Sequence, residues 1–248
     1  MAEILLKDGE RINQLFSTDV KIIQNREVFS YSVDSVLLSR FPNLPKRGLI
    51  VDLCAGNGAV GLFASTRTQA QIIAVEIQER LADMAQRSIE LNNLTSQMQV
   101  IQDDLKYLTR YISGSKVDMI LCNPPYFKVD EHSNLNASRH YLLARHEIAT
   151  NLEEICQISQ RVLKSNGRLT MVHRPERFLD IIETMTAHNL APKRIQFVYP
   201  KANRKANMLL IEAIKDGSRD GLKILPPLFI HNQDGSYTPE IHEIYYGK

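Results

Sequence analysis

Short apolar runs of strand length alternate with stretches of helical periodicity through most of this 248-residue chain. Runs this apolar suit strands that are covered on both faces, and strands separated by helices pair in parallel. The sequence therefore predicts an α/β fold, a doubly wound and mostly parallel sheet with helices on both faces. The expected parallel strands span residues 49–53, 71–77, 98–102, 117–122 and 167–173.

Capping residues mark the expected helix ends. Asn92-Asn93 ends a helix whose apolar residues recur from 81 to 89. A second helix over 151–163 is expected to be capped by Thr150 or Asn151, with Glu153-Glu154 in its first turn, and Asn166-Gly167 is expected to stop it. Upstream, residues 31–41 predict a turn that leads into a short helix.

The C-terminal part of the predicted sheet is antiparallel. The apolar runs 195–199 and 208–214 lie close enough in sequence to form an antiparallel hairpin at the end of the sheet. Pro226-Pro227 is expected to end any further strand, because proline cannot donate to a ladder. We expect one domain over 1–248, in which an extension, 1–48, packs on a core over 49–230.

A glycine-rich turn follows the first strand. Gly56, Gly58 and Gly61 spell G-x-G-x-x-G, and glycines at this position let the backbone approach a nucleotide while the next helix offers free N–H groups. The pattern fits either a dinucleotide or S-adenosylmethionine. Its alternative reading is a tight strand-to-helix turn without a ligand.

Acidic residues recur at three strand ends and favour a cationic ligand. Asp52 precedes the glycines, Glu76 ends the second strand, and Asp103-Asp104 follow the third. Carboxylates attract an ammonium and a sulfonium but repel a pyrophosphate. We expect Glu76 on the ribose, Asp52 near the methionyl ammonium, and either Asp103 or Asp104 beside the adenine amino group.

The fourth strand leads directly into Asn123-Pro124-Pro125-Tyr126. The two prolines fix an extended turn and present Asn123 and Tyr126 at the carboxyl edge of the sheet. The Asn123 amide oxygen and the Pro124 carbonyl can accept both hydrogens of a planar NH₂ group, which favours its tetrahedral, nucleophilic form. Tyr126 is expected to stack on the flat substrate group. The alternative is an ordinary proline turn with a buried tyrosine.

These motifs together resemble the amino-methyltransferases of the class I, S-adenosylmethionine-dependent superfamily. The resemblance covers roughly the central half of the chain and implies a Rossmann-like fold and S-adenosylmethionine as methyl donor, with no metal. Flanking segments resemble the bacterial enzymes that N6-methylate adenine 37 in the anticodon loop of a valine tRNA. Those segments are Tyr31-Ser-Val-Asp-Ser-Val-Leu-Leu, Arg145-His-Glu and Arg204-Lys-Ala-Asn-Met-Leu-Leu-Ile-Glu-Ala.

The resemblance implies further site residues. Tyr31 and Asn57 join Gly56 and Gly58 as cofactor contacts, Asn123 contacts both cofactor and substrate, and Arg145, Arg204 and Lys205 join Tyr126 as substrate contacts. An ion pair between Arg145 and Glu147 is an equal alternative for the first arginine. The partner implied is tRNA or another structured RNA, bound by a monomer.

Charge and composition limit the classes of protein to which this chain can belong. The net charge is only +2, but residues 161–205 carry +7, which suits phosphate binding or a solvated basic face. Charged residues from Lys7 to Arg11 exclude an N-terminal signal peptide, so a cytoplasmic protein that binds no membrane is expected. Three separated cysteines predict neither a disulfide framework nor a zinc site, and strand alternation turns Cys122 away from Asn123 as a buried thiol.

Other functions stay open at this point. Release-factor glutamine methyltransferases also carry Asn-Pro-Pro-Tyr, although they have a long helical domain where this chain has about forty-eight residues. Guanine-N2 methylation of RNA is a further possibility. The hypothesis of a dinucleotide-dependent oxidoreductase is supported by the G-x-G-x-x-G glycines alone. A non-catalytic binding module would bind the ligand without transferring a methyl group.

Overall fold

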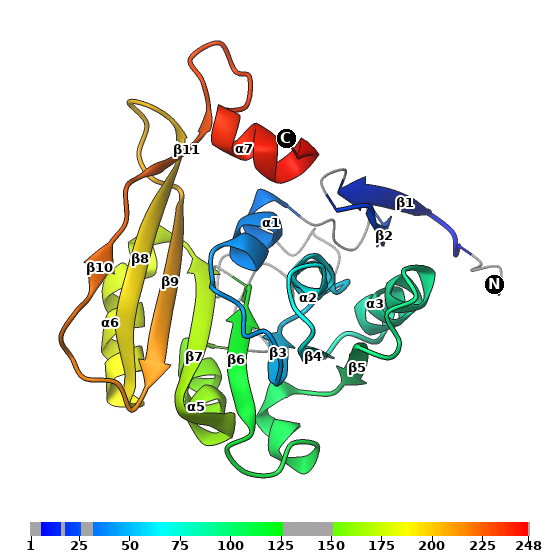
Figure 1. The fold of residues 1–248 in the computed structure, drawn as a ribbon, viewed down its shortest axis with the longest axis horizontal. Helices are drawn as coiled ribbons and strands as arrows, with labels where there is room; N and C mark the ends of the chain where they lie inside the picture. The colour runs from blue at the N-terminus through cyan, green and yellow to red at the C-terminus, as the bar shows by residue number, and fades with distance from the viewer. Residues whose placement is uncertain (1–5, 16–17, 26–31, 126–150, 248) are drawn as a thin grey trace, which may run out of the picture.

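The computed structural model describes residues 6–15, 18–25, 32–125 and 151–247. Within them, the main sheet has nine strands. Seven of these form its body, in the order β5 (Met98–Gln102), β4 (Gln71–Glu76), β3 (Leu49–Leu53), β6 (Val117–Cys122), β7 (Leu163–His173), β9 (Met208–Lys215) and β8 (Leu190–Lys201) (Figure 1). All described neighbours pair in parallel except β9, which is antiparallel to both β7 and β8.

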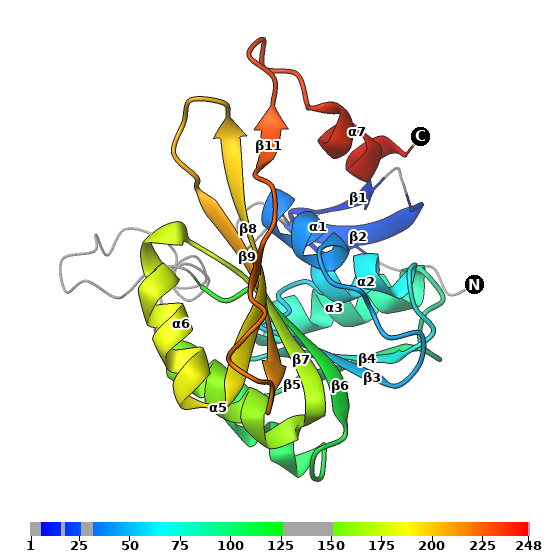
Figure 2. The same ribbon diagram turned by 60° about the vertical axis from the view of Figure 1, so that its left-hand side comes forward.

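This arrangement confirms the predicted fold class and the antiparallel hairpin. The alternation along each strand sends side chains to two separate apolar cores, one on each face of the sheet. One face is covered by α1 (Val33–Arg40), α2 (Ala59–Ser65) and α3 (Glu79–Leu91). The other is covered by the 3₁₀ helix η1 (Leu105–Arg110), by α5 (Leu152–Val162) and by α6 (Phe178–Ala187), which follows the short 3₁₀ turn η2 (Pro175–Arg177) (Figure 2).

The chain changes direction across the sheet between β3 and β6. From β3 it runs outward through β4 to β5, then returns to place β6 on the other side of β3. In open α/β sheets, ligands bind at the carboxyl ends of the strands where the order reverses in this way. The ends of β3 and β6, where Leu53 pairs with Cys122, are therefore the place to look for a site.

A small antiparallel hairpin precedes the sheet and packs on α3. Its strands are β1 (Glu10–Leu15) and β2 (Val20–Asn25). Arg87 of α3 makes two 2.7 Å hydrogen bonds to the carboxylate of Glu10, whose side chain is only 1% exposed. The Ser88 hydroxyl also accepts a hydrogen bond from the Ile23 N–H, so the hairpin is fixed to the helix by buried polar contacts.

Two sequence expectations about element ends were wrong. Asn166-Gly167 does not stop α5, which ends at Val162, because both residues lie in a bulge of β7 where Asn166 has φ of +64°. Pro226-Pro227 does not end the strands either. The prolines separate β10 (Lys223–Ile224) from β11 (Leu228–His231), and both strands pair with the outer edge of β8.

The last helix, α7 (Pro239–Tyr246), follows β11 and was not expected from the sequence. Its Ile241 is fully buried in the core on the α1 and α2 side of the sheet, so the segment after residue 230 packs with the main sheet. No helix in the described ranges is long and apolar enough to cross a membrane.

Candidate functional site

The turn after β3 is held in a conformation that favours glycine. Cys54, Gly56 and Gly58 all have positive φ, of +56°, +59° and +83°. Gly58 is the N-cap of α2, and a Cβ added there would lie 3.1 Å from the Ala85 Cβ of α3. The glycines therefore permit both the sharp turn and the close approach of two helices.

Asp52 lies beneath this turn and is fully buried. Its Oδ2 accepts a hydrogen bond of 2.9 Å from the Gly61 N–H, whereas its Oδ1 is buried with no hydrogen-bond partner among the described residues. Burial raises the pKa of Asp52 to about 7; the Gly61 N–H lowers it and the Glu76 carboxylate raises it further. An unsatisfied carboxylate oxygen next to the turn favours a cationic or hydrogen-bond-donating ligand.

Glu76, at the end of β4, supports the same turn from the neighbouring strand. Its Oε2 accepts from the Gly56 N–H at 2.8 Å and its Oε1 accepts from the Gln78 N–H at 2.9 Å. Burial raises the pKa of Glu76, although these two N–H groups and that of Ile77 oppose the rise. Glu76 thus sets the position of the glycine turn as well as lying at the predicted ribose position.

The structure distinguishes Asp103 from Asp104. Asp104 caps η1 by accepting from the Lys106 N–H at 3.0 Å, and its second oxygen lies 3.3 Å from the Lys106 ammonium. Asp103 instead accepts from its neighbour's N–H and, at 2.8 Å, from the Tyr111 hydroxyl. Because the Asp104 carboxylate caps η1 and pairs with Lys106, Asp103 is the better candidate for a ligand contact.

Asn57 has a different environment from the other residues of the turn. Its side chain is fully buried, and its amide nitrogen donates a 3.0 Å hydrogen bond to the Ile23 carbonyl of β2. The Asn57 side chain therefore links the glycine turn to the N-terminal hairpin. Its amide oxygen is buried with no hydrogen-bond partner among the described residues, like Asp52 Oδ1, so the predicted cofactor contact of Asn57 stays a prediction.

Asn123 follows β6 directly and lies beside the end of β3. Its amide nitrogen donates to the Ser35 hydroxyl of α1 at 3.3 Å, and the next residue, Pro124, is buried. Ser35 is only 2% exposed, so the Asn123 amide nitrogen is held by a buried partner on α1. Sequence reasoning missed Ser35, although it lies within the flanking motif that begins at Tyr31.

Cys122 does not share the face of Asn123. It is fully buried in the core on the α5 and α6 side, and burial raises the pKa of its thiol well above the usual range. The prediction of a buried thiol on the opposite face is confirmed.

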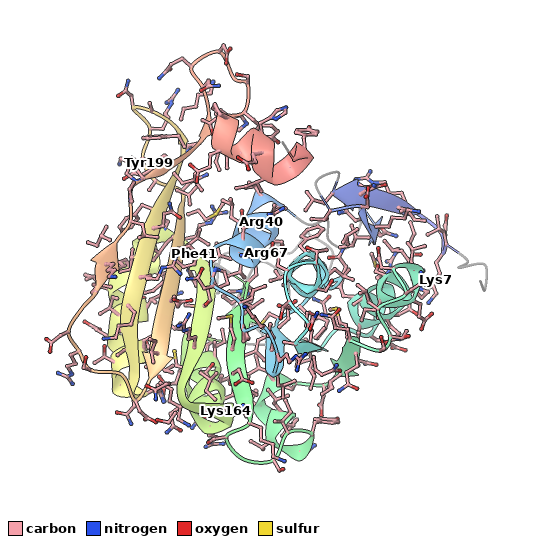
Figure 3. All side chains as sticks on the ribbon, in the orientation of Figure 1. Lys7, Arg40, Phe41, Arg67, Lys164 and Tyr199 are labelled. Atoms are coloured by element: carbon pink, nitrogen blue, oxygen red, sulfur yellow. The ribbon has the colours of Figure 1, made fainter. Side chains whose placement is uncertain are left out.

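The basic segment 161–205 is divided between the two edges of the sheet. At the amino edge, Lys164 forms an ion pair with Asp118. Within β8, Arg194 is level with Leu121 of β6 and lies 3.4 Å from Glu212 and over the Phe41 ring. At the carboxyl edge, the exposed Arg204 and Lys205 form no ion pair with any described residue. Figure 3 shows this separation, with Lys164 and Tyr199 at opposite ends of the sheet.

Three predicted site residues, Tyr31, Tyr126 and Arg145, lie outside the described residues. Within the described part of the chain, no group of three His, Cys, Asp or Glu side chains is arranged to hold a metal ion. The described site therefore consists of an acidic half at β3 to β5, in which Asp52 and Glu76 are buried, and a polar half at β6 to β9.

Solved structures of methyltransferases share this fold. A predicted O-methyltransferase from Agrobacterium tumefaciens superimposes with a TM-score of 0.68, at 24% identity, over 86% of this chain and 96% of that one. Geranyl diphosphate C-methyltransferase from Streptomyces coelicolor A3(2) gives a TM-score of 0.56, at 13% identity, over 74% and 75%.

Curated relatives and a family model complete the comparison. This chain is 25% identical over 214 residues to the tRNA1(Val) (adenine(37)-N6)-methyltransferase of Shewanella sp. (strain MR-7), covering 86% of this chain and 89% of the relative. It is 27% identical, over the same shares, to the protein of that name from Bacteroides fragilis (strain YCH46). The family model described as the methyltransferase small domain matches residues 19–189, more than half of the chain. The chain therefore belongs to the methyltransferase small domain family and is a methyltransferase.

Proposed function

We propose that this methyltransferase uses S-adenosylmethionine to methylate the N6 amino group of an adenine in the anticodon loop of a tRNA. The observation that carries the proposal is the position of Asn123 and Pro124 at the reversal point of the sheet, next to the acidic glycine turn. The printed names of the curated relatives support the acceptor.

The acidic half of the site fits the methyl donor. The unsatisfied Asp52 Oδ1 suits a nearby ammonium, directly or through water, and Glu76 suits the two ribose hydroxyls. We assign Asp103 to the adenine amino group of the donor, and the backbone of residues 56–58 to the approach of its methionyl part. When bound, the donor supplies an electrophilic methyl group on a sulfonium.

The polar half fits a planar NH₂ acceptor. Asn123 Oδ1 and the Pro124 carbonyl would accept the two N6 hydrogens, which draws the nitrogen lone pair out of conjugation with the ring. The nitrogen then takes the methyl group as the carbon–sulfur bond breaks, and one proton passes from nitrogen to water. Ser35 has a positioning role, because holding the Asn123 amide nitrogen at 3.3 Å directs the amide oxygen elsewhere.

Two other acceptors present the same kind of group. A protein glutamine has a planar amide NH₂, and guanine N2 in RNA has a planar amino group. An anticodon-loop adenine is favoured here because it is already unpaired, so that placing it at the sheet edge costs little. The basic β8–β9 turn at the same edge also suits RNA more than a protein.

A transfer assay with labelled S-adenosylmethionine tests the acceptor class. We expect label in tRNA from a strain that lacks the enzyme, and none in a release-factor protein that contains an unmodified glutamine. Label in the release factor but not in tRNA would contradict the proposal. A heat-inactivated enzyme and tRNA from the wild-type strain are the matched controls.

A further inference from the structure

We propose that a C-terminal rim of the molecule is the RNA-docking surface, with phosphates on the β8–β9 turn and bases stacked on the rings of α7. This inference rests on the proposed RNA acceptor. The rim consists of three cations in the turn and five rings from β11, the following turn and α7. Its members are Lys201, Arg204, Lys205, His231, Tyr237, His242, Tyr245 and Tyr246.

Contacts between the two turns make the rim one structure. His231 pairs in register with Lys201, and its Nδ1 lies 3.2 Å from the Pro200 carbonyl oxygen. The Lys201 ammonium donates to the Gln233 carbonyl at 3.4 Å. From the end of β7, Arg174 donates at 2.7 Å to the Asn207 carbonyl on the other side of the β8–β9 turn. The cations are therefore held next to the rings.

α7 is fixed firmly enough to present its rings in one orientation. Thr238 caps the helix, its hydroxyl donates to the Phe229 carbonyl at 2.8 Å, and its N–H donates to the Ile230 carbonyl at 3.0 Å. The buried Ile241 anchors the helix in the main core, and Tyr245, one turn further on, packs against the same core. A surface that is ordered before binding loses less conformational entropy when a partner docks.

The five rings form a continuous row. His231 stacks on Tyr237 at a centroid distance of 5.1 Å, Tyr237 stacks on Tyr245 at 5.3 Å, and Tyr246 continues the row to His242. Tyr237 and Tyr246 are nonetheless 37% and 49% exposed. Aromatic rings that remain exposed beside cations are the usual platform for unpaired bases.

Charge determines how the partner lies on the rim. Arg204 and Lys205 are exposed and form no ion pair with described residues. Two acids, Glu240 and Glu243, lie on α7, whereas Asp234, in the turn before it, is close enough to Lys201 for the ammonium to contribute to lowering its pKa. Phosphates are therefore attracted to the β8–β9 turn and repelled from α7, which leaves the rings to the bases.

The rim lies at the edge of the sheet that carries Asn123. β8 runs parallel to β6 and is separated from it by β7 and β9, which places it roughly 14 Å away across the sheet at the usual strand spacing. Through these ladders Ile195 is level with Cys122, and β8 continues to Lys201, so its carboxyl end also lies roughly 20 Å further along the strand direction. Figures 1 and 2 both show the β8–β9 turn, β11 and α7 grouped at one end of the molecule. The rim and Asn123 are therefore placed to contact separate parts of one RNA molecule.

Salt-dependent binding of an unmodified tRNA transcript tests the phosphate part. Arg204→Gln/Lys205→Gln removes two cations, and we expect the slope of log affinity against log salt concentration to fall by roughly 1.4 to 1.8. The matched control, Arg219→Gln/Lys223→Gln, removes two exposed cations away from the rim, since Lys223 pairs with Arg194, seven residues before Lys201; it should keep the wild-type slope. Equal slopes for the wild type and the rim variant would overturn the proposal.

A ring substitution tests the stacking part. Tyr246→Ala should weaken binding by about 5- to 150-fold without changing the salt slope, while Tyr246→Phe should bind within about twofold of the wild type. Unchanged affinity of Tyr246→Ala, or a wild type that binds no RNA, would overturn the proposal, and the latter result would favour a protein partner.

The two proposals can fail separately. If the wild-type enzyme methylates adenine in tRNA but the rim variants keep full RNA affinity, the rim is not the docking surface and the proposed function still holds. If the rim variants lose RNA affinity but the RNA product is another methylated nucleoside, the rim is the docking surface and the adenine acceptor is refuted.

Discussion

The two halves of the sheet edge are built differently. At the ends of β3 and β4, Asp52 and Glu76 are buried and each accepts a hydrogen bond from the backbone of the glycine turn or its helix. On the turn between β8 and β9, the cations Arg204 and Lys205 are exposed. The first half holds its polar groups in place by burial, and the second presents them to solvent.

The two halves are therefore suited to different ligands. A small donor of fixed shape is best recognised by groups that are ordered before it binds, whereas a large polyanion is attracted by exposed cations. Asn123 lies between the halves, at the end of β6, and contacts α1 through Ser35. Substitutions in the two halves should therefore change different measured quantities.

Asn123→Ala should have the largest effect. Removing the acceptor for the substrate amino group should lower kcat by about a thousandfold, the upper range for loss of one group that stabilises a transition state. Because Asn123 lies outside the acidic half, the affinity for S-adenosylmethionine should change by less than about threefold. Isothermal titration with the donor and single-turnover transfer on the same preparation check both expectations. A full rate in the variant would refute the mechanism.

Asp52→Asn should change how stability depends on pH. The folded pKa of Asp52 is raised to about 7, so between its unfolded value and 7 the folded protein binds a proton that the unfolded chain does not, and stability is lost as pH rises. Relative to the wild type, the variant should gain about 3 kcal/mol in the free energy of unfolding from pH 5 to pH 8. Urea unfolding measures this, with the exposed Asp220→Asn as control. Parallel pH profiles of Asp52→Asn and the wild type would contradict the assignment.

Glu76→Gln should weaken donor binding and leave RNA binding unchanged. The variant loses the charge-assisted hydrogen bond to Gly56 and the charged partner of the ribose, for which we expect about a 10- to 100-fold higher Kd for S-adenosylmethionine. Glu79→Gln, an exposed acid three residues further on, is the matched control and should bind normally. If both variants bind the donor equally well, Glu76 does not contact it.

Ser35→Ala should have the smallest effect. Losing one neutral hydrogen bond that orients Asn123 should lower kcat by about fivefold without a change in donor Kd. Ser39→Ala provides the control, because Ser39 is equally buried on the same helix but its hydroxyl bonds only the Val36 carbonyl. An equal loss of kcat in both variants would indicate a structural effect on α1 and not a positioning role.

The sequence predicted what depends on local pattern. Apolar runs place β3, β5 and β6 at the observed bounds, because these signals involve residues close in the chain. Of the two expected caps of α5, Thr150 and Asn151, the structure uses Asn151, together with Glu154. The acids at the strand ends followed from the parallel topology. The buried state of Asp52 did not, since it depends on Gly61 and on the packing of α2 over β3.

Features built from distant segments were missed. The β1–β2 hairpin is stabilised by Arg87, 77 residues away from Glu10, and β11 pairs with β8 in spite of the preceding prolines. The prolines were misleading because they lie in the connection between two edge strands, where no ladder hydrogen bond is needed. The ring row of α7 likewise joins residues whose spacing in the sequence shows no regular pattern.

The most direct measurement of the central claim is the identity of the methylated nucleoside. The wild-type enzyme is incubated with labelled S-adenosylmethionine and unmodified tRNA, and the RNA is digested to nucleosides and analysed by mass spectrometry. We expect the label in N6-methyladenosine. Label in N2-methylguanosine, or no labelled nucleoside from an enzyme that binds the donor, would contradict it.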